Sequence, residues 1–241
     1  MKRMLSALLA ALLLLNLAAC GEKDEPDETP AYGDALITEL YAEEGDYRDP
    51  VGNETHYVYH VPQIVSETAV AAAINAEIAD AFGSIVQDQK NMMAARASLT
   101  CPAVRWESHW NGSLLCLLLS RDMDDGSTHY AVYSYDFFGG QRLTGEDLIA
   151  RCGLSAADFI AAARRTAANC FDEMYRGALT GGTSGADFAA AYAERRAWTI
   201  SDENINLQTP LYLDGGALKL ILPIGSFAGA GSYERIIPLD T

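Results

Sequence analysis

Apolar and polar residues alternate along several short stretches of the chain, which is typical of β-strands with one buried face. In THYVYHVPQI the apolar positions are aromatic or β-branched, so a strand is predicted over residues 55–61, with Pro62 expected to end it. The period then changes from two to four, which predicts a helix of about five turns that Ser66 can cap. The apolar stripe of this helix consists of Val70, Ile74, Ile78, Phe82 and Val86.

A β-hairpin is predicted in VRWESHWNGSLLCLLLS, because Asn111-Gly112 is a strong signal for a two-residue turn. This turn would place Trp110 opposite Ser113 and set the register of both strands. One face of the hairpin is then mainly apolar and is expected to pack on the helix. The other face mixes polar and apolar side chains, namely Arg105, Glu107, His109, Leu114, Cys116 and Leu118.

The remaining strands and helices are predicted from the same two spacings of apolar residues, every second residue in strands and about every fourth in helices. HYAVYSYDFF is predicted as a third strand of a meander, and Ser155 with Asp158 marks the start of a second helix. The residues expected to face the interior from that helix are Phe159, Ala163, Ala167, Cys170 and Met174. A short third helix carries Phe188 and Tyr192, and a hairpin around residues 214–216 precedes a last strand in SYERIIPL.

The N-terminus has the layout of an export signal, because Lys2 and Arg3 precede an apolar run that is shorter than the ~20 residues of a membrane-spanning helix. The run ends in LAAC, which resembles the lipobox of bacterial lipoproteins and implies lipidation of Cys20 and removal of residues 1–19 as a signal peptide. The alternative is a cysteine that falls by chance at the end of an uncleaved leader. Residues 20–34 are charged and poor in apolar side chains, so a disordered tether is expected. We therefore expect a lipid-anchored protein on the extracytoplasmic face of the cell membrane.

The net charge of the chain limits which classes of molecule it is expected to bind. The chain has 17 basic and 33 acidic residues, and losing Lys2 and Arg3 with the leader changes the net charge from −16 to −18. Nucleic acid is therefore not expected as a partner. Such acidity would speed the encounter with a cationic partner, although a merely solvated surface explains it as well.

Four cysteines follow Cys20, and an even number outside the cell invites a disulfide interpretation. Cys152 and Cys170 flank or lie within one predicted helix, which would separate them by ~20 Å, far beyond the ~7 Å limit for a bridge. Cys101 and Cys116 do not face each other in the predicted hairpin. We expect mostly free, buried thiols, with pairing between distant elements left open.

No motif predicts a metal or cofactor. His56 and His60 are ~13 Å apart on a strand, too far to share an ion. His109 and His129 could approach each other across the sheet, but the sequence implies no third ligand. We interpret both as ordinary strand histidines.

Other candidates for chemistry have simpler explanations. DMDDGSTHY lacks the spacing of a calcium loop and is predicted as a turn. Ser184 in GGTSG is better explained as a helix cap than as a nucleophile, and GSFAGAGS lacks the spacing of a phosphate-binding loop. Glu146 and Asp147 could serve as acid and base, but acidic pairs are common in this chain. The chain is therefore not predicted to be an enzyme.

Several segments between residues 57 and 239 share an order: YHVPQI, AAINAEI, the tryptophan hairpin, GSTHYAVYSYDFFGGQRLTGEDLI, and LYLDGGALKLILPIGSFAGAGSYERIIPL. This order resembles a bacterial extracytoplasmic module of unknown function, found in lysozyme-sensing anti-sigma factors and beside polysaccharide deacetylase domains. Where the family's centre reads glycine, glycine, alanine, histidine, this chain has GSTH and keeps His129. The resemblance implies an α+β fold, with helices packed on antiparallel sheets in two subdomains, residues 35–121 and 122–241.

Together these features favour an envelope protein that binds a wall polymer or a cationic wall-active protein such as lysozyme. One alternative is an envelope hydrolase that uses carboxylates or His129, the one weak functional candidate besides Cys20. Another is an assembly role, which an exposed apolar patch around Leu114, Leu118, Tyr133 and Tyr135 would suggest.

Overall fold

The strand predicted at residues 55–61 is longer than expected and has a partner that the sequence pattern did not reveal. The computed structural model describes residues 32–180, 186–227 and 231–240. In it β2 (Glu54–Ile64) pairs antiparallel with β1 (Ile37–Arg48), which follows a single 3-10 turn, η1 (Asp34–Leu36). Pro62 does not end β2: it lies opposite Glu39, in a part of the strand where no ladder with β3 requires its missing N–H.

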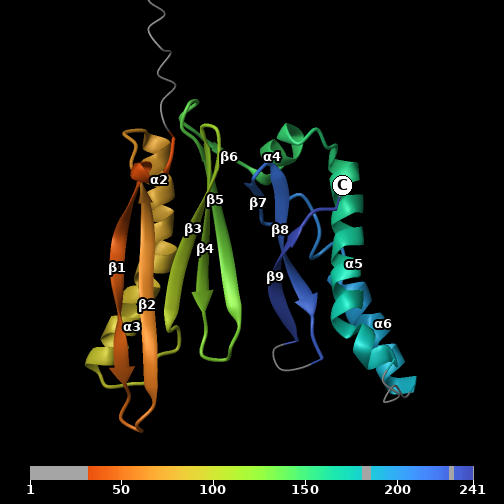
Figure 1. Cartoon of the computed structure of the whole chain (residues 1–241), viewed down its shortest axis with the longest axis horizontal. Coiled ribbons are helices and arrows are strands. Elements are labelled where there is room, and N and C mark those ends of the chain that lie inside the picture. The colour runs from red at the N-terminus through yellow and green to blue at the C-terminus, as the bar shows by residue number, and fades with distance from the viewer. Residues whose placement is uncertain (1–31, 181–185, 228–230, 241) are drawn as a thin grey trace, which may run out of the picture. The chain divides into compact units, whose positions relative to one another are not determined.

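The chain has an α+β fold with a six-stranded mixed sheet and a three-stranded antiparallel sheet (Figure 1). The six strands lie in chain order, continuing with β3 (Ala103–Asn111), β4 (Leu114–Asp122), β5 (Thr128–Asp136) and β6 (Gln141–Leu143). All neighbours are antiparallel except β2 and β3, which run parallel and pair only at Val58 and Tyr59. This parallel pair departs from the expected all-antiparallel sheets.

One long apolar helix connects β2 to β3. It comprises α2 (Ala69–Ile78), the π-helical turn η2 (Ala79–Gly83) and α3 (Ser84–Ala94). By length and composition this helix could cross a membrane, but core helices of soluble proteins pass the same test. Its predicted stripe is confirmed, since Ile74, Ile78, Phe82 and Val86 are buried against the sheet.

Side-chain hydrogen bonds fix both ends of this helix. Thr68, not Ser66, is the N-cap and accepts a hydrogen bond from the N–H of Ala71. Near the other end the buried Gln89 side chain accepts hydrogen bonds from the N–H groups of Thr100 (3.0 Å) and Cys101 (3.1 Å). The segment that enters β3 is thereby held on the helix.

The β3–β4 hairpin has the predicted faces but not the predicted register. Trp110 lies opposite Leu115 rather than Ser113, because the two-residue loop is Gly112-Ser113 and Asn111 belongs to the strand. Gly112 has φ 63°, which fits a type II′ turn. The slip is an even number of residues, so each side chain stays on its expected face.

Both faces of the six-stranded sheet are covered at β4, near the centre of the sheet. Leu115, Leu117 and Leu119 of β4 pack with the α2 side, as the apolar face of the hairpin predicts. Cys116 and Leu118 of the same strand face the opposite way and pack against a second group of helices and strands, which is described below. β4 is thus buried over six consecutive residues.

The second group consists of helices and a small sheet. Its elements are α4 (Gly145–Arg151), α5 (Ala156–Thr180), α6 (Ala186–Thr199), β7 (Leu211–Asp214), β8 (Ala217–Gly225) and β9 (Ser232–Pro238). The predicted hairpin at residues 214–216 is confirmed, with Gly215 and Gly216 both at positive φ as a type I′ turn needs. Residues 32–241 form one compact unit, and the expected subdomain boundary at 121/122 falls inside the β4–β5 hairpin.

The predicted inner face of α5 needs one correction. Phe159, Ala163 and Ala167 are buried as expected, but Met174 is 40% exposed and Phe171 is fully buried instead. The predicted stripe takes a step of three residues from Ala167 to Cys170, whereas the buried stripe takes a step of four to Phe171, and Cys170 is only partly buried. Ser155 and Asp158 form the predicted capping contacts.

An ion pair connects α5 to α6. The Asp172 carboxylate on α5 accepts two hydrogen bonds from the Arg196 guanidinium on α6, at 2.8 and 3.0 Å.

All four described cysteines are free, as predicted, but only Cys101 and Cys116 are buried.

Candidate functional site

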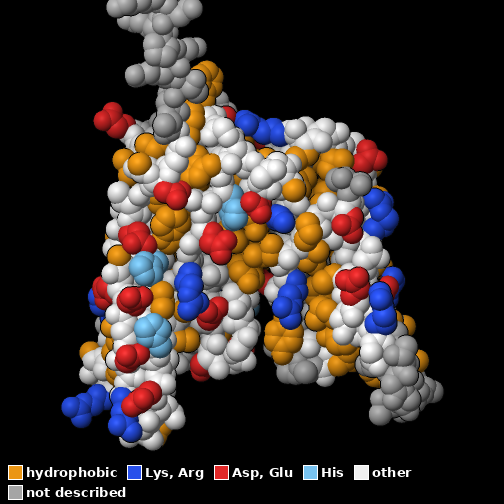
Figure 2. Space-filling view, in the orientation of Figure 1, with side chains coloured by type: hydrophobic (Ala, Val, Ile, Leu, Met, Phe, Trp, Pro, Cys, Tyr) orange, Lys and Arg blue, Asp and Glu red, His pale blue; other side chains and the backbone are white. Residues whose placement is uncertain are grey.

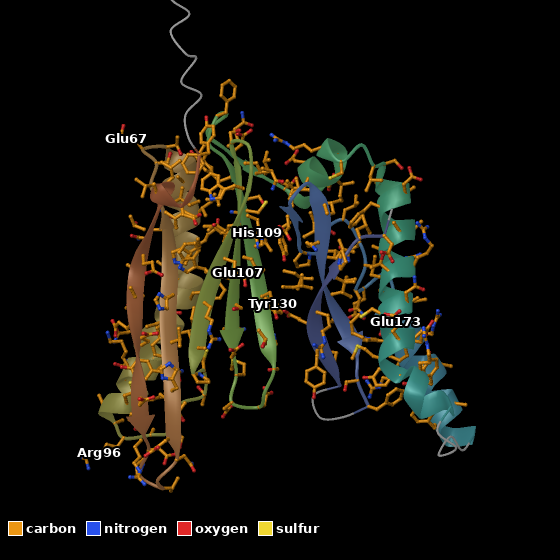
Figure 3. The ribbon with its side chains drawn as sticks, in the orientation of Figure 1. Glu67, Arg96, Glu107, His109, Tyr130 and Glu173 are labelled. Carbon is orange, nitrogen blue, oxygen red and sulfur yellow. The ribbon has the colours of Figure 1, made fainter. Side chains whose placement is uncertain are left out.

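His109 lies between the two sheets, in a region that we call the seam. The seam also contains Asn111 of β3, Tyr130 of β5, and Tyr212 and Asp214 of β7. β3 points it away from the α2 side, and Figure 3 shows it with Glu107 and Tyr130 on the part of the six-stranded sheet that neighbours β7 and β9. Its ring packs against the Tyr212 ring with centroids 4.6 Å apart. Its Nδ1 lies 3.3 Å from Asp214 Oδ1, and its Nε2 lies 3.7 Å from Glu107 Oε2.

The Nε2 atom of His109 is buried without a hydrogen-bond partner among the residues that the structure describes. The side chain as a whole is only 14% exposed. Buried polar atoms are usually paired, so an unpaired one marks either a cost in stability or a position kept for a ligand or proton.

Asn111 holds this seam together. Its Nδ2 donates to the Leu213 carbonyl (3.1 Å), and its Oδ1 accepts from the N–H of Gly216 (3.0 Å). The end of β3 is thereby fixed to the β7–β8 turn, which places Asp214 beside His109.

The tyrosines of the seam remain protonated at neutral pH. Burial is the main cause that raises the pKa of Tyr212 to about 12, with a smaller contribution from the charge of Asp214. Burial also raises the pKa of Tyr130, helped by Asp122. Neither hydroxyl is therefore a ready base.

His129, the histidine singled out from the sequence, lies elsewhere. Its Nδ1 is 3.3 Å from Glu234 Oε1 on β9, and its side chain is 42% exposed. The second carboxylate oxygen of Glu234 accepts the N–H of Tyr130 at 2.8 Å, which fixes the acid in place. A half-exposed imidazole beside an oriented carboxylate can transfer protons.

His109 and His129 do not approach each other across the sheet. His109 lies opposite Cys116 and His129 opposite Arg121, so they are separated by five residues along β4, or ~17 Å. No group of three potential metal ligands occurs among the described residues.

A cavity of about 570 Å³ lies between β5, β6, the start of α4 and the loop before β7. Tyr130, Val132, Thr144 and Gln208 are part of its lining, and Arg142 is the one charged residue among the described residues that line it. The Arg142 guanidinium pairs with Glu77 of α2, at 2.6 Å. The cavity is within the range of small-ligand sites and is nearly uncharged.

The outer face of the β1–β2 hairpin is polar and acidic. We define it as the central part of the face opposite α2, formed by the directly paired residues Ala42, Glu44, Asp46, His56, Val58 and His60. The next pair on this face, Arg48 and Glu54, forms an ion pair of its own at 3.9 Å. Figure 2 shows carboxylates and histidines over these two strands. His56 pairs with Asp46 (2.9 Å) and His60 with Glu39 (2.7 Å), so each histidine has its own carboxylate partner.

The apolar patch that would suggest an assembly role is absent from the described surface. Leu114, Leu118, Tyr133 and Tyr135 are all less than 9% exposed, since both faces of the sheet are covered at β4 and β5. Of the other acidic candidates, Asp147 is used in the capping box of Thr144 at the start of α4. Cys20 and Ser184 lie outside the described residues.

Sequence reasoning found the histidines but missed the contact between His109 and Asp214. These residues are 105 positions apart and no local pattern connects them. No protein-family model matches the chain, and no curated protein matches it.

Proposed function

We propose that this chain is a lipid-anchored protein of the bacterial cell envelope that binds a cationic wall-active protein, such as a lysozyme. The leader that ends at Cys20 supports the anchor, and the family resemblance supports the class of ligand. The excess of acidic residues, 33 against 17 basic ones, supports attraction of a cationic partner.

The observation that carries this proposal is the acidic outer face of the β1–β2 hairpin. Glu44 has no ion-pair partner among the described residues, and the partner of Asp46 is a histidine rather than a permanent cation. Carboxylates left without cations attract a cationic protein over about 8 Å at physiological salt.

Calorimetric titration of residues 21–241 with a lysozyme, at low and moderate salt, tests the proposal. Saturable binding that persists at moderate salt is expected. The double variant Glu44→Lys, Asp46→Lys should bind at least tenfold more weakly. The double variant Asp88→Lys, Glu203→Lys makes the same change in net charge at exposed acids on α3 and in the loop before β7, and serves as the matched control. Absent binding, or equal weakening by both changes, would reject this form of the proposal.

The anchor has its own test. A full chain with Cys20→Ser should move from the membrane fraction to the soluble exported fraction. Retention of the variant in the membrane would reject lipidation at this residue.

A wall polymer is the second candidate ligand, and the nearly uncharged cavity beside Tyr130 favours it. A neutral glycan could stack on the Tyr130 ring and use the Gln208 amide, both of which line the cavity. This candidate would be supported if soluble wall fragments bind the unchanged protein and the Tyr233→Ala variant but do not bind the Tyr130→Ala variant.

A hydrolase remains the alternative from another class, and the pair of His129 and Glu234 favours it. Release of fragments from purified wall, lost in His129→Ala but kept in His56→Ala, would support catalysis. Equal release by both variants would reject a role for His129.

A further inference from the structure

The longest free edge of either sheet belongs to β1. This strand has 12 residues, and β2 is its one ladder partner among the described residues (Figure 1). The other outer strands are short or covered: β6 has three residues, β7 has four, and β9 contacts both β5 and α5. Proteins usually protect long edges, because unpaired N–H and C=O groups pair with other chains.

The direction of the backbone groups of β1 follows from the turn that ends it. The N–H of Asp49 donates to the carbonyl of Asn53, so these two residues form a hydrogen-bonded pair. Hydrogen-bonded and non-hydrogen-bonded pairs alternate along an antiparallel ladder. Counting back along the register, Ala42, Glu44 and Asp46 belong to non-hydrogen-bonded pairs and direct their N–H and C=O groups outward.

The same three residues carry exposed side chains on the outer face of the β1–β2 hairpin. The edge thus presents outward backbone groups together with two carboxylates, those of Glu44 and Asp46. On the opposite face Lys90 of α3 already pairs with Glu43, at 2.7 Å.

We propose that the β1 edge binds an extended cationic segment of a partner protein as an added antiparallel or parallel strand. Lysine or arginine at every second position of that segment would lie beside Glu44 and Asp46, while its backbone pairs with the outward groups of β1. This inference rests on the proposed function for the cationic character of the partner.

Charge argues against the two other occupants. A second copy of this chain, paired edge to edge through β1, would bring carboxylates against carboxylates, which is unfavourable. The segment GEKDEPDETP at residues 21–30 is acidic as well, so it meets the same repulsion.

Amide hydrogen exchange of residues 21–241, with and without saturating lysozyme, tests the mode of binding. The outward amides of Ala42, Glu44 and Asp46 should exchange at least tenfold more slowly in the complex. The amides of Glu43 and Gly45, already bonded to β2, should change little and serve as internal controls. Bound lysozyme without this alternating protection would overturn the inference and leave the proposed function intact.

A pair of variants at Ala42 gives a second test. Ala42→Pro removes one outward N–H and no bond to β2, and edge strands tolerate proline at such positions. It should weaken lysozyme binding about tenfold, equivalent to about 1.4 kcal/mol, whereas Ala42→Val should bind like the unchanged protein. Equal affinity of the two variants would overturn the inference. If Ala42→Pro does not fold, the exchange measurement on the unchanged protein decides.

If lysozyme does not bind at all, that form of the proposed function fails and a synthetic peptide decides the inference separately. The probe is a short peptide in which lysine and valine alternate, compared with one of equal composition whose lysines are grouped at one end. Alternating protection of the β1 amides by the first peptide alone would support strand addition. Equal protection by both, or none, would overturn it.

Discussion

Replacing His109 by phenylalanine should stabilise the protein. The imidazole is buried in the seam between the two sheets, where its Nε2 atom has no hydrogen-bond partner among the described residues. His109→Phe keeps an aromatic ring in the same place and removes both nitrogens. The substitution therefore tests whether the His109 imidazole stabilises the fold or is kept at a cost in stability, for a ligand or a proton.

The expected magnitude follows from three contributions. Removing a buried unpaired polar atom gains about 1–3 kcal/mol. Losing the 3.3 Å contact with Asp214 costs less than about 1 kcal/mol, because the Asp214 side chain is 45% exposed and regains water. The ring contact with Tyr212, with centroids 4.6 Å apart, is kept. The net effect should be a gain of about 1 kcal/mol in the free energy of unfolding.

Urea unfolding of residues 21–241 measures this change, and the melting temperature should rise by about 2–4 °C. His56→Phe is the control, since that side chain is 60% exposed and its replacement should alter stability by less than about 0.5 kcal/mol. A loss of more than about 1 kcal/mol in His109→Phe would refute the reasoning, because it would mean that Nε2 makes a stabilising interaction.

Three other predictions concern a buried hydrogen bond, the inner face of α5 and the ion pair between α5 and α6. Gln89→Leu leaves the buried N–H of Cys101 without an acceptor and should cost about 2–4 kcal/mol in urea unfolding. Phe171→Ala should cost about 3–5 kcal/mol and Met174→Ala less than about 1 kcal/mol, and the reverse order would contradict the assigned inner face of α5. Hydrogen bonds from the Arg196 guanidinium hold the pKa of Asp172 below the ordinary 3.8. The ionised Asp172 therefore stabilises the fold at neutral pH, and this stabilisation is lost as the pH falls through the lowered pKa. Asp172→Asn should make the free energy of unfolding less dependent on pH in the acidic range, as measured by urea unfolding at several pH values.

The strand that the sequence did not reveal, β1, lacks the signal on which prediction rests. Its segment ITELYAEEGDYR has acidic residues on the outer face and only partly buried side chains on the other, so apolar alternation is weak. An edge strand covered on one face by a helix needs few buried positions. Its pairing with β2 comes from the short turn that joins them, not from hydrophobic periodicity.

The hairpin register shows the opposite case, in which a strong local signal was overridden. Asn111-Gly112 favours a turn, but the Asn111 side chain bonds to Leu213 and Gly216 of a distant turn. That contact keeps Asn111 in the strand and moves the loop one residue on. Each side chain still lies on its predicted face, because the register differs by two residues and strand side chains alternate with a period of two.

The candidate site was the least predictable part. The histidines could be found from the sequence, but the contact of His109 with Asp214 and that of His129 with Glu234 both join residues more than 100 positions apart. No local sequence pattern connects a strand residue to a carboxylate in another sheet.

The double burial of β4 has a consequence for folding. Alternate residues of this one strand belong to the hydrophobic cluster of α2 and to that of α5 and β8. Neither cluster can lose its packing without exposing half of the same strand, so the two clusters should melt in a single cooperative transition. A fragment that ends after β4 would leave Cys116 and Leu118 in water and should aggregate rather than fold as an independent domain.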